Sequence, residues 1–411
     1  MKRRRLALGF LTGLCGFVAI GTAAAQNLVI SNARILDGAG GEIANGTIVV
    51  EDGVILSVGA GGPPSGAANV IDAGGRTVMP GFIDAHRHLG TAPPELMKSF
   101  IDAGFTTVLD ALGDVPALAE VRRKIDTGEI VGPRLRLSGL VPLNGTAMPG
   151  GGDPARHDPA RIPFDERDPV DATPPDQARA MVDRVAEQGA DNIKIILVAS
   201  PKGDDVPTLL AISDEAHKKG LRMITHTTSV VDAVEAAEGH TDLFAHTPHI
   251  GWVDEGGALE KIAAAGAPMV TTLGVFTPFF DGTDEHDAIF RDYGPFPWDT
   301  LHSAGQGPVN ERLLWNAGVP IGYGTDTSFP PRDSLRHELR ALSSVFSPEE
   351  LVTILTKNAA VCADVDDITG TVEAGKQADL VMVDGDPLTD IFAVLDVRLV
   401  VKGGAIVSDQ R

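Results

Sequence analysis

Short apolar runs separated by turn residues occupy both ends of the chain. Turn pairs such as Asp37-Gly38, Asn45-Gly46 and Asp52-Gly53 punctuate the N-terminal runs, a pattern typical of antiparallel strands. The runs cover residues 28–30, 47–50 and 54–58 near the N-terminus, and residues 379–383, 397–402 and 405–408 near the C-terminus. Neither set is large enough to bury a core alone, so we predict one small β-sandwich domain built from residues 26–77 and 364–411.

Between these ends the pattern changes to short apolar strands followed by helical stretches, for example residues 207–219 and 257–265. The candidate strands cover residues 78–83, 106–110, 134–138, 192–197, 222–226, 243–246, 268–272 and 320–326. Strands that alternate with helices indicate a parallel sheet with crossover connections, and eight such units predict a closed (β/α)8 TIM barrel over residues 78–363. In such barrels the reactive groups lie at the C-terminal ends of the strands.

Chemically active side chains stand at those strand ends. His86 and His88 follow the first strand, and because strand side chains alternate between faces, both project to the same side. Two imidazoles on one face can bind a metal ion, although an isolated pair of this kind more often only hydrogen-bonds to nearby backbone. Further candidates recur downstream, and they are Lys194 in the fourth strand, His226 at the end of the fifth, His246 at the end of the sixth and Asp326 at the end of the eighth.

Two connections are long, over residues 139–176 and 273–307. Loops of this length inside a compact domain are usually functional. The second holds seven of the chain's 20 aromatic residues, and it could form either a substrate-facing wall or a loop that packs on itself. The residues expected to contact substrate are Phe276, Phe279, Phe280, Tyr293, Trp298 and His302.

The first 25 residues have the layout of a signal peptide. Lys2 and three arginines precede an apolar run over residues 6–20, and a small-residue segment ends at Ala25. The run is too short and too glycine-rich for a good membrane span. We therefore expect the mature protein to be periplasmic or secreted and to have no membrane association after cleavage; the Sec and twin-arginine routes both stay open.

Composition narrows the partners. The 411 residues are 43% hydrophobic and 22% charged, as in a folded soluble protein. Loss of residues 1–25 removes one lysine, three arginines and no acidic residue, which takes the formal charge from −22 to −26. This balance disfavours nucleic acid and anionic membranes as partners. Cys362 is then the only cysteine, so the fold must be held by its core, with metal as a further support.

Taken together, five motifs resemble the amidohydrolase superfamily, in particular its imidazolonepropionase-like and Xaa-Pro-dipeptidase-like metal hydrolases. They are Met79-Pro80-Gly81-Phe82-Ile83-Asp84-Ala85-His86-Arg87-His88, Asn192-Ile193-Lys194-Ile195, Phe244-Ala245-His246, Gly324-Thr325-Asp326 and Gly375-Lys376-Gln377-Ala378-Asp379-Leu380-Val381. The resemblance covers essentially everything after the signal peptide.

The resemblance implies two divalent metal ions, commonly Zn²⁺, at the mouth of the barrel. His86, His88 and Asp326 would bind one ion, His226 and His246 the other, and an N6-carboxylated Lys194 would bridge them. Carboxylation explains a lysine here, because an ammonium would be repelled by two cations whereas a carbamate supplies two anionic oxygens. An unmodified Lys194 in a one-metal site, and a His226 that only supports a ligand, remain alternatives.

The implied chemistry is hydrolysis of an amide, cyclic amide, carbamate or ester by metal-bridged hydroxide, with Asp326 moving the proton. His249, three residues after His246, could orient substrate or stabilise the oxyanion, and a capping role is equally compatible. Arg156, Arg161, Arg167 and Lys202 could meet a substrate carboxylate, or simply be solvated.

The resemblance also has a gap. Dipeptidases of this branch tend to carry a tyrosine after the modified lysine, and residues 198–205 contain none. A small apolar or aromatic substrate therefore suits the chain better than an Xaa-Pro dipeptide. The alternatives are an Xaa-Pro-type or related dipeptidase and a catalytically silent, metal-stabilised ligand-binding protein. We expect a small-molecule substrate as the partner and leave a homo-oligomer open.

Overall fold

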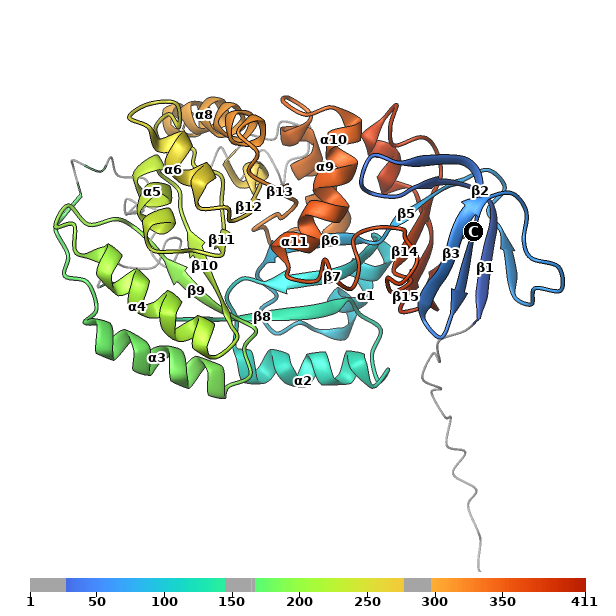
Figure 1. Ribbon diagram of the computed structural model, residues 1–411, viewed down its shortest axis with the longest axis horizontal. Coiled ribbons are helices and arrows are strands. Elements are labelled where there is room, and N and C mark those ends of the chain that lie inside the picture. Colours follow the sequence, from blue (N-terminus) through green and yellow to red (C-terminus); the bar gives the residue numbers. More distant parts are fainter. Residues whose placement is uncertain (1–26, 145–163, 165–166, 277–296) are drawn as a thin grey trace, which may run out of the picture.

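The computed structural model describes residues 27–144, 164, 167–276 and 297–411, with the backbone alone described for residues 276 and 297–304. Figure 1 shows a ring of strands surrounded by helices, beside a sheet in which the blue N-terminal and red C-terminal strands lie together. No helix of the described residues is long and apolar enough to cross a lipid bilayer.

The ring is a parallel barrel whose strands are hydrogen-bonded in chain order. Its strands are β6 (Phe82–Arg87), β7 (Phe105–Asp110), β8 (Arg134–Leu140), β9 (Asn192–Ile196), β10 (Arg222–His226), β11 (Leu243–Phe244), β12 (Met269–Val270) and β13 (Ile321–Gly322). Backbone bonds close the ring between β6 and the residues after β13: the Ala85 amide donates to the Tyr323 carbonyl at 3.0 Å, and the Asp326 amide to the His86 carbonyl at 2.9 Å. The predicted (β/α)8 barrel is confirmed.

Helices cover the outside of the barrel. They are α1 (Pro94–Asp102), α2 (Val115–Asp126), α3 (Pro175–Glu187), α4 (Asp205–Lys218), α5 (Val230–Glu238), α6 (Ala258–Ala264), α8 (Pro297–Asn316), α9 (Pro331–Leu342), α10 (Pro348–Thr353) and α11 (Ala359–Cys362), with shorter turns η3 (Leu273–Phe276), η4 (Ile354–Asn358) and η5 (Ile391–Leu395). The residues at the start of α5 show why a helix begins there: Ser229 and Asp232 form a reciprocal capping box that satisfies two backbone amides.

One sheet joins both ends of the chain, as expected for the small β-sandwich domain. Its strands are β1 (Leu28–Leu36), β2 (Glu42–Glu51), β3 (Val54–Ala60), β4 (Val70–Asp72), β5 (Thr77–Pro80), β14 (Leu380–Val383), β15 (Val397–Lys402) and β16 (Ala405–Asp409). Strand β5 makes the connection, because it pairs parallel with β1 and antiparallel with β14. A shared cluster that includes Ile30, Ile48, Leu380 and Leu399 fills the interior.

The strand predicted over residues 78–83 is divided at Gly81. Residues before it pair within the sandwich sheet, and the barrel begins at Phe82, whose amide donates to the Gly104 carbonyl at 2.9 Å. A Cβ at position 81 would lie 2.3 Å from Thr106 Oγ1, so only glycine fits where the chain crosses between the sheets. The prediction of one strand was wrong because both halves are buried and the apolar run is continuous.

The loop predicted over residues 273–307 is also shorter than expected. The turn η3 occupies its start, and α8 already begins at Pro297. The sequence did not predict this helix because it contains Gly305, Gly307 and Pro308, and glycine and proline disfavour helix interiors. Tertiary contacts of the buried side chains Gln306, Asn310 and Glu311 override that preference.

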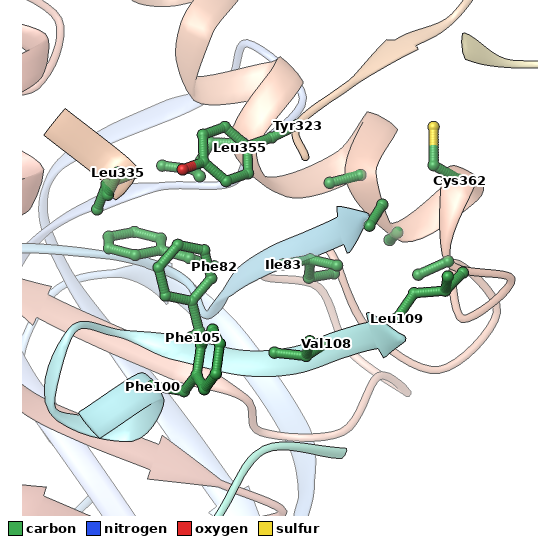
Figure 2. Close-up of a cluster of buried hydrophobic side chains, with 14 of the residues drawn as sticks. Phe82, Ile83, Phe100, Phe105, Val108, Leu109, Tyr323, Leu335, Leu355 and Cys362 are labelled. Carbon is green, nitrogen blue, oxygen red and sulfur yellow. The ribbon is translucent and has the colours of Figure 1, made fainter. Parts of the chain in front are cut away.

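Aromatic side chains support the strand that carries His86. In Figure 2, Phe82 of β6 and Phe105 of β7 lie beside Phe100 of α1 and below Tyr323. The Phe82 and Phe105 rings meet edge to face with centroids 5.9 Å apart, and Phe100 and Phe105 do so at 6.0 Å. Because such packed rings leave little freedom, β6 is held firmly where its histidines emerge.

Asp379 links the sandwich domain to the barrel, and its replacement is expected to lower the stability of the protein. Its fully buried carboxylate accepts from Arg134 Nη1 of β8 at 2.8 Å and from the Gly403 amide at 2.7 Å. Asp379→Ala leaves a cation and an amide unpaired, so the free energy of unfolding should fall by about 3 kcal/mol. Urea unfolding measures this, and Asp409→Ala, which removes an exposed ion pair with Arg411, should cost under about 1 kcal/mol. Equal losses in the two variants would contradict the assignment.

Candidate metal centre

His86, His88 and Asp326 converge at the C-terminal mouth of the barrel, where β6 meets the residues after β13. His88 Nε2 lies 2.9 Å from Asp326 Oδ1, and His86 Nε2 lies 3.6 Å from the same oxygen. His86 is 1% exposed, whereas the His88 side chain is 40% exposed. The alternation along β6 thus brings both imidazoles to one carboxylate.

His246, His226 and Lys194 complete the group from the neighbouring strands. His246 Nε2 lies 3.9 Å from Asp326 Oδ2, and the His246 ring centroid is 4.6 Å from that of His86 and 4.4 Å from that of His226. Potential ligand atoms of His86, His246 and Asp326 all lie within 4.8 Å of one another. The structure therefore brings the imidazoles of all four predicted histidines together beside Asp326, and Lys194 lies close enough to act on the charge of three of them.

Three nitrogen atoms in this group are buried without a hydrogen-bond partner among the described residues: His86 Nε2, His226 Nε2 and Lys194 Nζ. An unpaired buried polar atom is costly, so several of them side by side need an explanation. Imidazole nitrogen and carboxylate oxygen suit zinc and similar divalent ions. The donor set and its orphaned atoms fit a metal centre.

Hydrogen bonds behind the histidines fix which ring nitrogen faces the centre. His246 Nδ1 lies 2.8 Å from Thr272 Oγ1, and His88 Nδ1 lies 3.3 Å from the Leu112 carbonyl oxygen. In both rings Nε2 is thereby directed toward Asp326, which is how metal-binding histidines are usually oriented. Thr272 and Asp326 have positive φ angles of 52° and 50°, a strained conformation for residues other than glycine.

Arg87 and Asp84, two further residues of β6, support the centre through Thr325, the residue that precedes Asp326. Arg87 is buried and donates to Thr325 Oγ1 at 3.0 Å and to Ser334 Oγ at 2.9 Å. Asp84 accepts from the Thr325 hydroxyl at 2.8 Å and from its amide at 3.2 Å. Two side chains of β6 therefore hold the residue that precedes Asp326. The sequence did not predict this role: alternation along β6 places Arg87 opposite the histidines but Asp84 on the same face as His86.

Burial sets the protonation of the centre. It lowers the pKa of His86, His226 and His246 well below the usual value, with Lys194 among the further causes, so these rings are held neutral, the form that binds metal. Burial also lowers the pKa of Lys194 to about 8 against the opposing effect of Asp326 and Asp110. A lysine with a lowered pKa is more often the free amine, which is the form that reacts with carbon dioxide.

Asp110, at the end of β7, is a neighbour that the sequence analysis did not single out. Its Oδ1 accepts from the Leu89 amide at 2.8 Å, and its Oδ2 is buried without a partner among the described residues. Burial raises its pKa to about 6, while His88 and Lys194 act in the opposite direction. The position of Asp110 at the end of a barrel strand is the sequence signal that could have identified it.

The remaining candidates are His249, four loop cations and the residues of the aromatic loop. His249 is buried, and its amide donates at 2.9 Å to the carbonyl of Thr228, two residues after His226, so it lies at the same mouth. Arg167 forms a buried ion pair with Asp232 at 2.7 Å, and Lys202 pairs with Asp171. The interpretation of these two cations as ligands for a substrate carboxylate is therefore not supported.

The aromatic candidates lie largely outside the described residues. This holds for Phe279, Phe280 and Tyr293, and for the cations Arg156 and Arg161. The structure gives only the backbone of the others, and these are Phe276 in η3 and Trp298 and His302 in α8. Their contact with substrate stays a prediction.

A second set of buried acids lies beside the mouth. Glu338 of α9 accepts from the amides of Leu273 at 2.9 Å and Gly274 at 2.6 Å, and the carboxyl group of Glu311 in α8 is fully buried. Burial raises the pKa of Glu338 to about 7, and burial together with Glu338 raises the pKa of Glu311 well above its usual value.

These acids predict a pH-dependent stability. A raised pKa means that the folded state binds more protons than the unfolded state between pH 4.5 and 7, so stability falls as pH rises; for Glu338 alone the loss is at most about 3 kcal/mol. Glu311→Gln should flatten this decline between about pH 5 and 8, as measured by urea unfolding at each pH. The exposed Glu349→Gln serves as the control, and an unchanged slope in Glu311→Gln would refute the prediction.

Comparison with known proteins agrees with the fold. The model of the Amidohydrolase family matches residues 77–407. The imidazolonepropionase of Shouchella clausii is 26% identical over 411 residues, covering 89% of this chain and 86% of its own.

Solved structures give the same result. A crystal structure of an amidohydrolase has a TM-score of 0.75 at 27% identity and covers 93% of this chain and 99% of its own. One assigned as a prolidase from Bifidobacterium longum has a TM-score of 0.75 at 25% identity and covers 94% of this chain and 97% of its own. The chain belongs to the amidohydrolase family, a generally metal-dependent family, and is a hydrolase that acts on carbon–nitrogen bonds.

Proposed function

We propose that this protein is an exported, binuclear metal-dependent amidohydrolase that cleaves an amide, carbamate or ester bond of a small apolar or aromatic substrate. One observation carries the proposal. Lys194 Nζ is buried without a partner among the described residues, beside imidazole nitrogens that are equally unpaired. Such a cluster is unfavourable by itself and becomes favourable when the lysine is carboxylated and divalent cations are bound.

Each side chain then has a distinct role. One ion would be held by His86, His88 and Asp326, and the other by His226 and His246. Carboxylated Lys194 would bind both ions. Zinc suits this set of nitrogen and oxygen donors. When bound, the ions activate water and polarise the scissile carbonyl. Asp326 Oδ1 and Oδ2 face the histidines of both halves, so this carboxylate can accept a proton from the attacking water and return it to the leaving group.

His249 completes the proposal as the residue that faces the substrate. It is buried at the same mouth, and a ring N–H can donate to the oxygen on which negative charge develops. Thr272 and the Leu112 carbonyl, in contrast, act only by holding the ligand rings in place.

The test is a hydrolysis screen of the mature, zinc-loaded protein with metal content measured in parallel. N-acyl aromatic amines, carbamates and esters should be turned over, with two metals bound per chain. The likeness to the prolidase from Bifidobacterium longum makes a dipeptidase the second candidate, and release of proline from Xaa-Pro dipeptides would favour it. Tight ligand binding without hydrolysis of any compound would instead favour a catalytically silent binding protein.

Export is tested separately. Residues 1–25 should be absent from the mature protein, so N-terminal sequencing of the periplasmic or secreted fraction should begin near Gln26. Detection of the intact N-terminus on all of the protein would contradict export by this route. Sedimentation of the same material would decide between a monomer and a homo-oligomer.

A further inference from the structure

The loop that carries His249 connects β11 to α6 and is held on one side by the connection between β10 and α5. The Thr228 carbonyl accepts from the His249 amide at 2.9 Å and from the Ile250 amide at 3.2 Å. The Val230 amide in turn donates to the Ile250 carbonyl at 2.9 Å. These contacts fix the backbone at His249 but leave the carbonyls and amides on its other side to be satisfied elsewhere.

Helix α8 satisfies them with two buried amide side chains. Asn310 Nδ2 donates to the carbonyls of Pro248 and Gly251, each at 2.9 Å, and its Oδ1 accepts from the Val253 amide at 3.2 Å. Gln306 Oε1 accepts from the Gly251 amide at 3.2 Å. Asn310 is 0% exposed, and its two carbonyl partners lie on either side of His249 along the chain.

Gly307 brings the helix directly against this histidine. A Cβ at position 307 would lie 3.4 Å from His249 Cβ and 3.1 Å from Leu273 Cδ2. Glycine costs about 1 kcal/mol in a helix interior, and Pro308 beside it costs more. Residues that disfavour a helix thus occur where α8 meets the loop, a pattern typical of a position selected for something other than helix stability.

We propose that Asn310 is a positioning residue that fixes the His249 side chain at the mouth of the barrel, with Gln306 in support. The inference rests on the proposed role of His249 toward substrate. Asparagine is the residue type that this arrangement requires, because it offers two N–H donors to the carbonyls and one oxygen to the amide. The hydrogen bonds from Asn310 and Gln306 to residues 248–253 form a clamp on the loop. The substitution Asn310→Asp keeps nearly the same shape but sets a carboxylate oxygen against two carbonyl oxygens, so it breaks this clamp with little change in volume.

The central experiment compares Asn310→Asp with His249→Ala and with the double variant. Asn310→Asp should lower kcat at least about 10-fold, the size seen when a supporting partner is lost, and should leave KM and the metal content nearly unchanged. In the His249→Ala background the same substitution should have little further effect, because residues that act through one group are not additive. A full additional loss in that background would overturn the proposal.

Amide hydrogen exchange provides a readout that does not depend on catalysis. Residues 249–253 should exchange faster in Asn310→Asp than in the parent protein, while Asn316→Asp, at the exposed end of the same helix, should change neither exchange nor kcat. Unchanged exchange in the loop would overturn the clamp. If Asn310→Asp does not fold, Gln306→Met removes one bond of the same clamp, and it should give a smaller loss of kcat that also disappears with His249→Ala.

Failure of the proposed function is distinguishable from failure of this inference. If the parent protein hydrolyses nothing in the screen, the hydrolytic role of the site fails, and exchange in residues 249–253 still decides whether Asn310 holds the loop.

Discussion

Lys194→Ala is expected to lose its bound metal and at least about 100-fold in kcat, more than the loss of a residue that merely supports a ligand. Lys194 is 2% exposed at β9, beside the strand β10 that supplies His226, and as a carbamate it would be the group shared by both ions. Alanine leaves the imidazoles without that anionic bridge. Elemental analysis and a steady-state assay on the best substrate measure the two losses together.

Two controls sharpen this result. Lys202→Ala removes an exposed lysine from the segment that follows the same strand, where it pairs with Asp171, and it should leave both metal content and kcat unchanged. Added formate or acetate should partly restore Lys194→Ala, because a short carboxylate can occupy the space of the missing carbamate. Two metals per chain and full activity in Lys194→Ala would rule out the bridging role.

Asp326→Asn should reduce kcat by about 100-fold to 10,000-fold, the range of a lost general acid–base group. Asparagine keeps the shape and one oxygen of the side chain but cannot take up a proton. The backbone around it is held by Thr325, Asp84 and Arg87, so the fold should survive. The expected pattern is therefore a large loss in kcat with a melting temperature close to that of the parent protein.

Asp333→Asn, on the solvent side of α9, is the matched control because it makes the same chemical change at a half-exposed carboxylate. It should leave kcat within about two-fold, as expected of a surface substitution. Parental kcat in Asp326→Asn would falsify the assignment of this carboxylate as the proton carrier.

The fold followed from the sequence wherever local pattern and tertiary structure agree. The barrel strands were predicted because each is a short, mainly apolar run followed by a helix, and the strand over residues 397–402 was predicted with its observed bounds. The errors lie where tertiary contacts, rather than the local sequence pattern, determine the secondary structure. The run through Gly81 changes sheets without a change in hydrophobicity, and α8 forms although Gly307 and Pro308 disfavour it.

The candidate site divides in the same way. His86 and His88 could be paired by strand alternation, and the later ligands by their positions at strand ends. Asp84 and Asn310 could not be found so easily, because their importance depends on which backbone groups the folded chain brings to them. A polar residue in a strand or helix carries no sign of such a partner in the sequence.

The closure of the barrel also has a kinetic consequence. Backbone bonds join β6 to the residues after β13, so His86 and Asp326, two ligands separated by most of the barrel sequence, become neighbours only when the ring closes. Bringing such distant segments together is slow, because the entropy of closing a long loop is lost before the contact forms. During synthesis the nascent chain would therefore carry scattered histidines but no assembled centre, and metal uptake should be a late event that accompanies the final closure of the barrel.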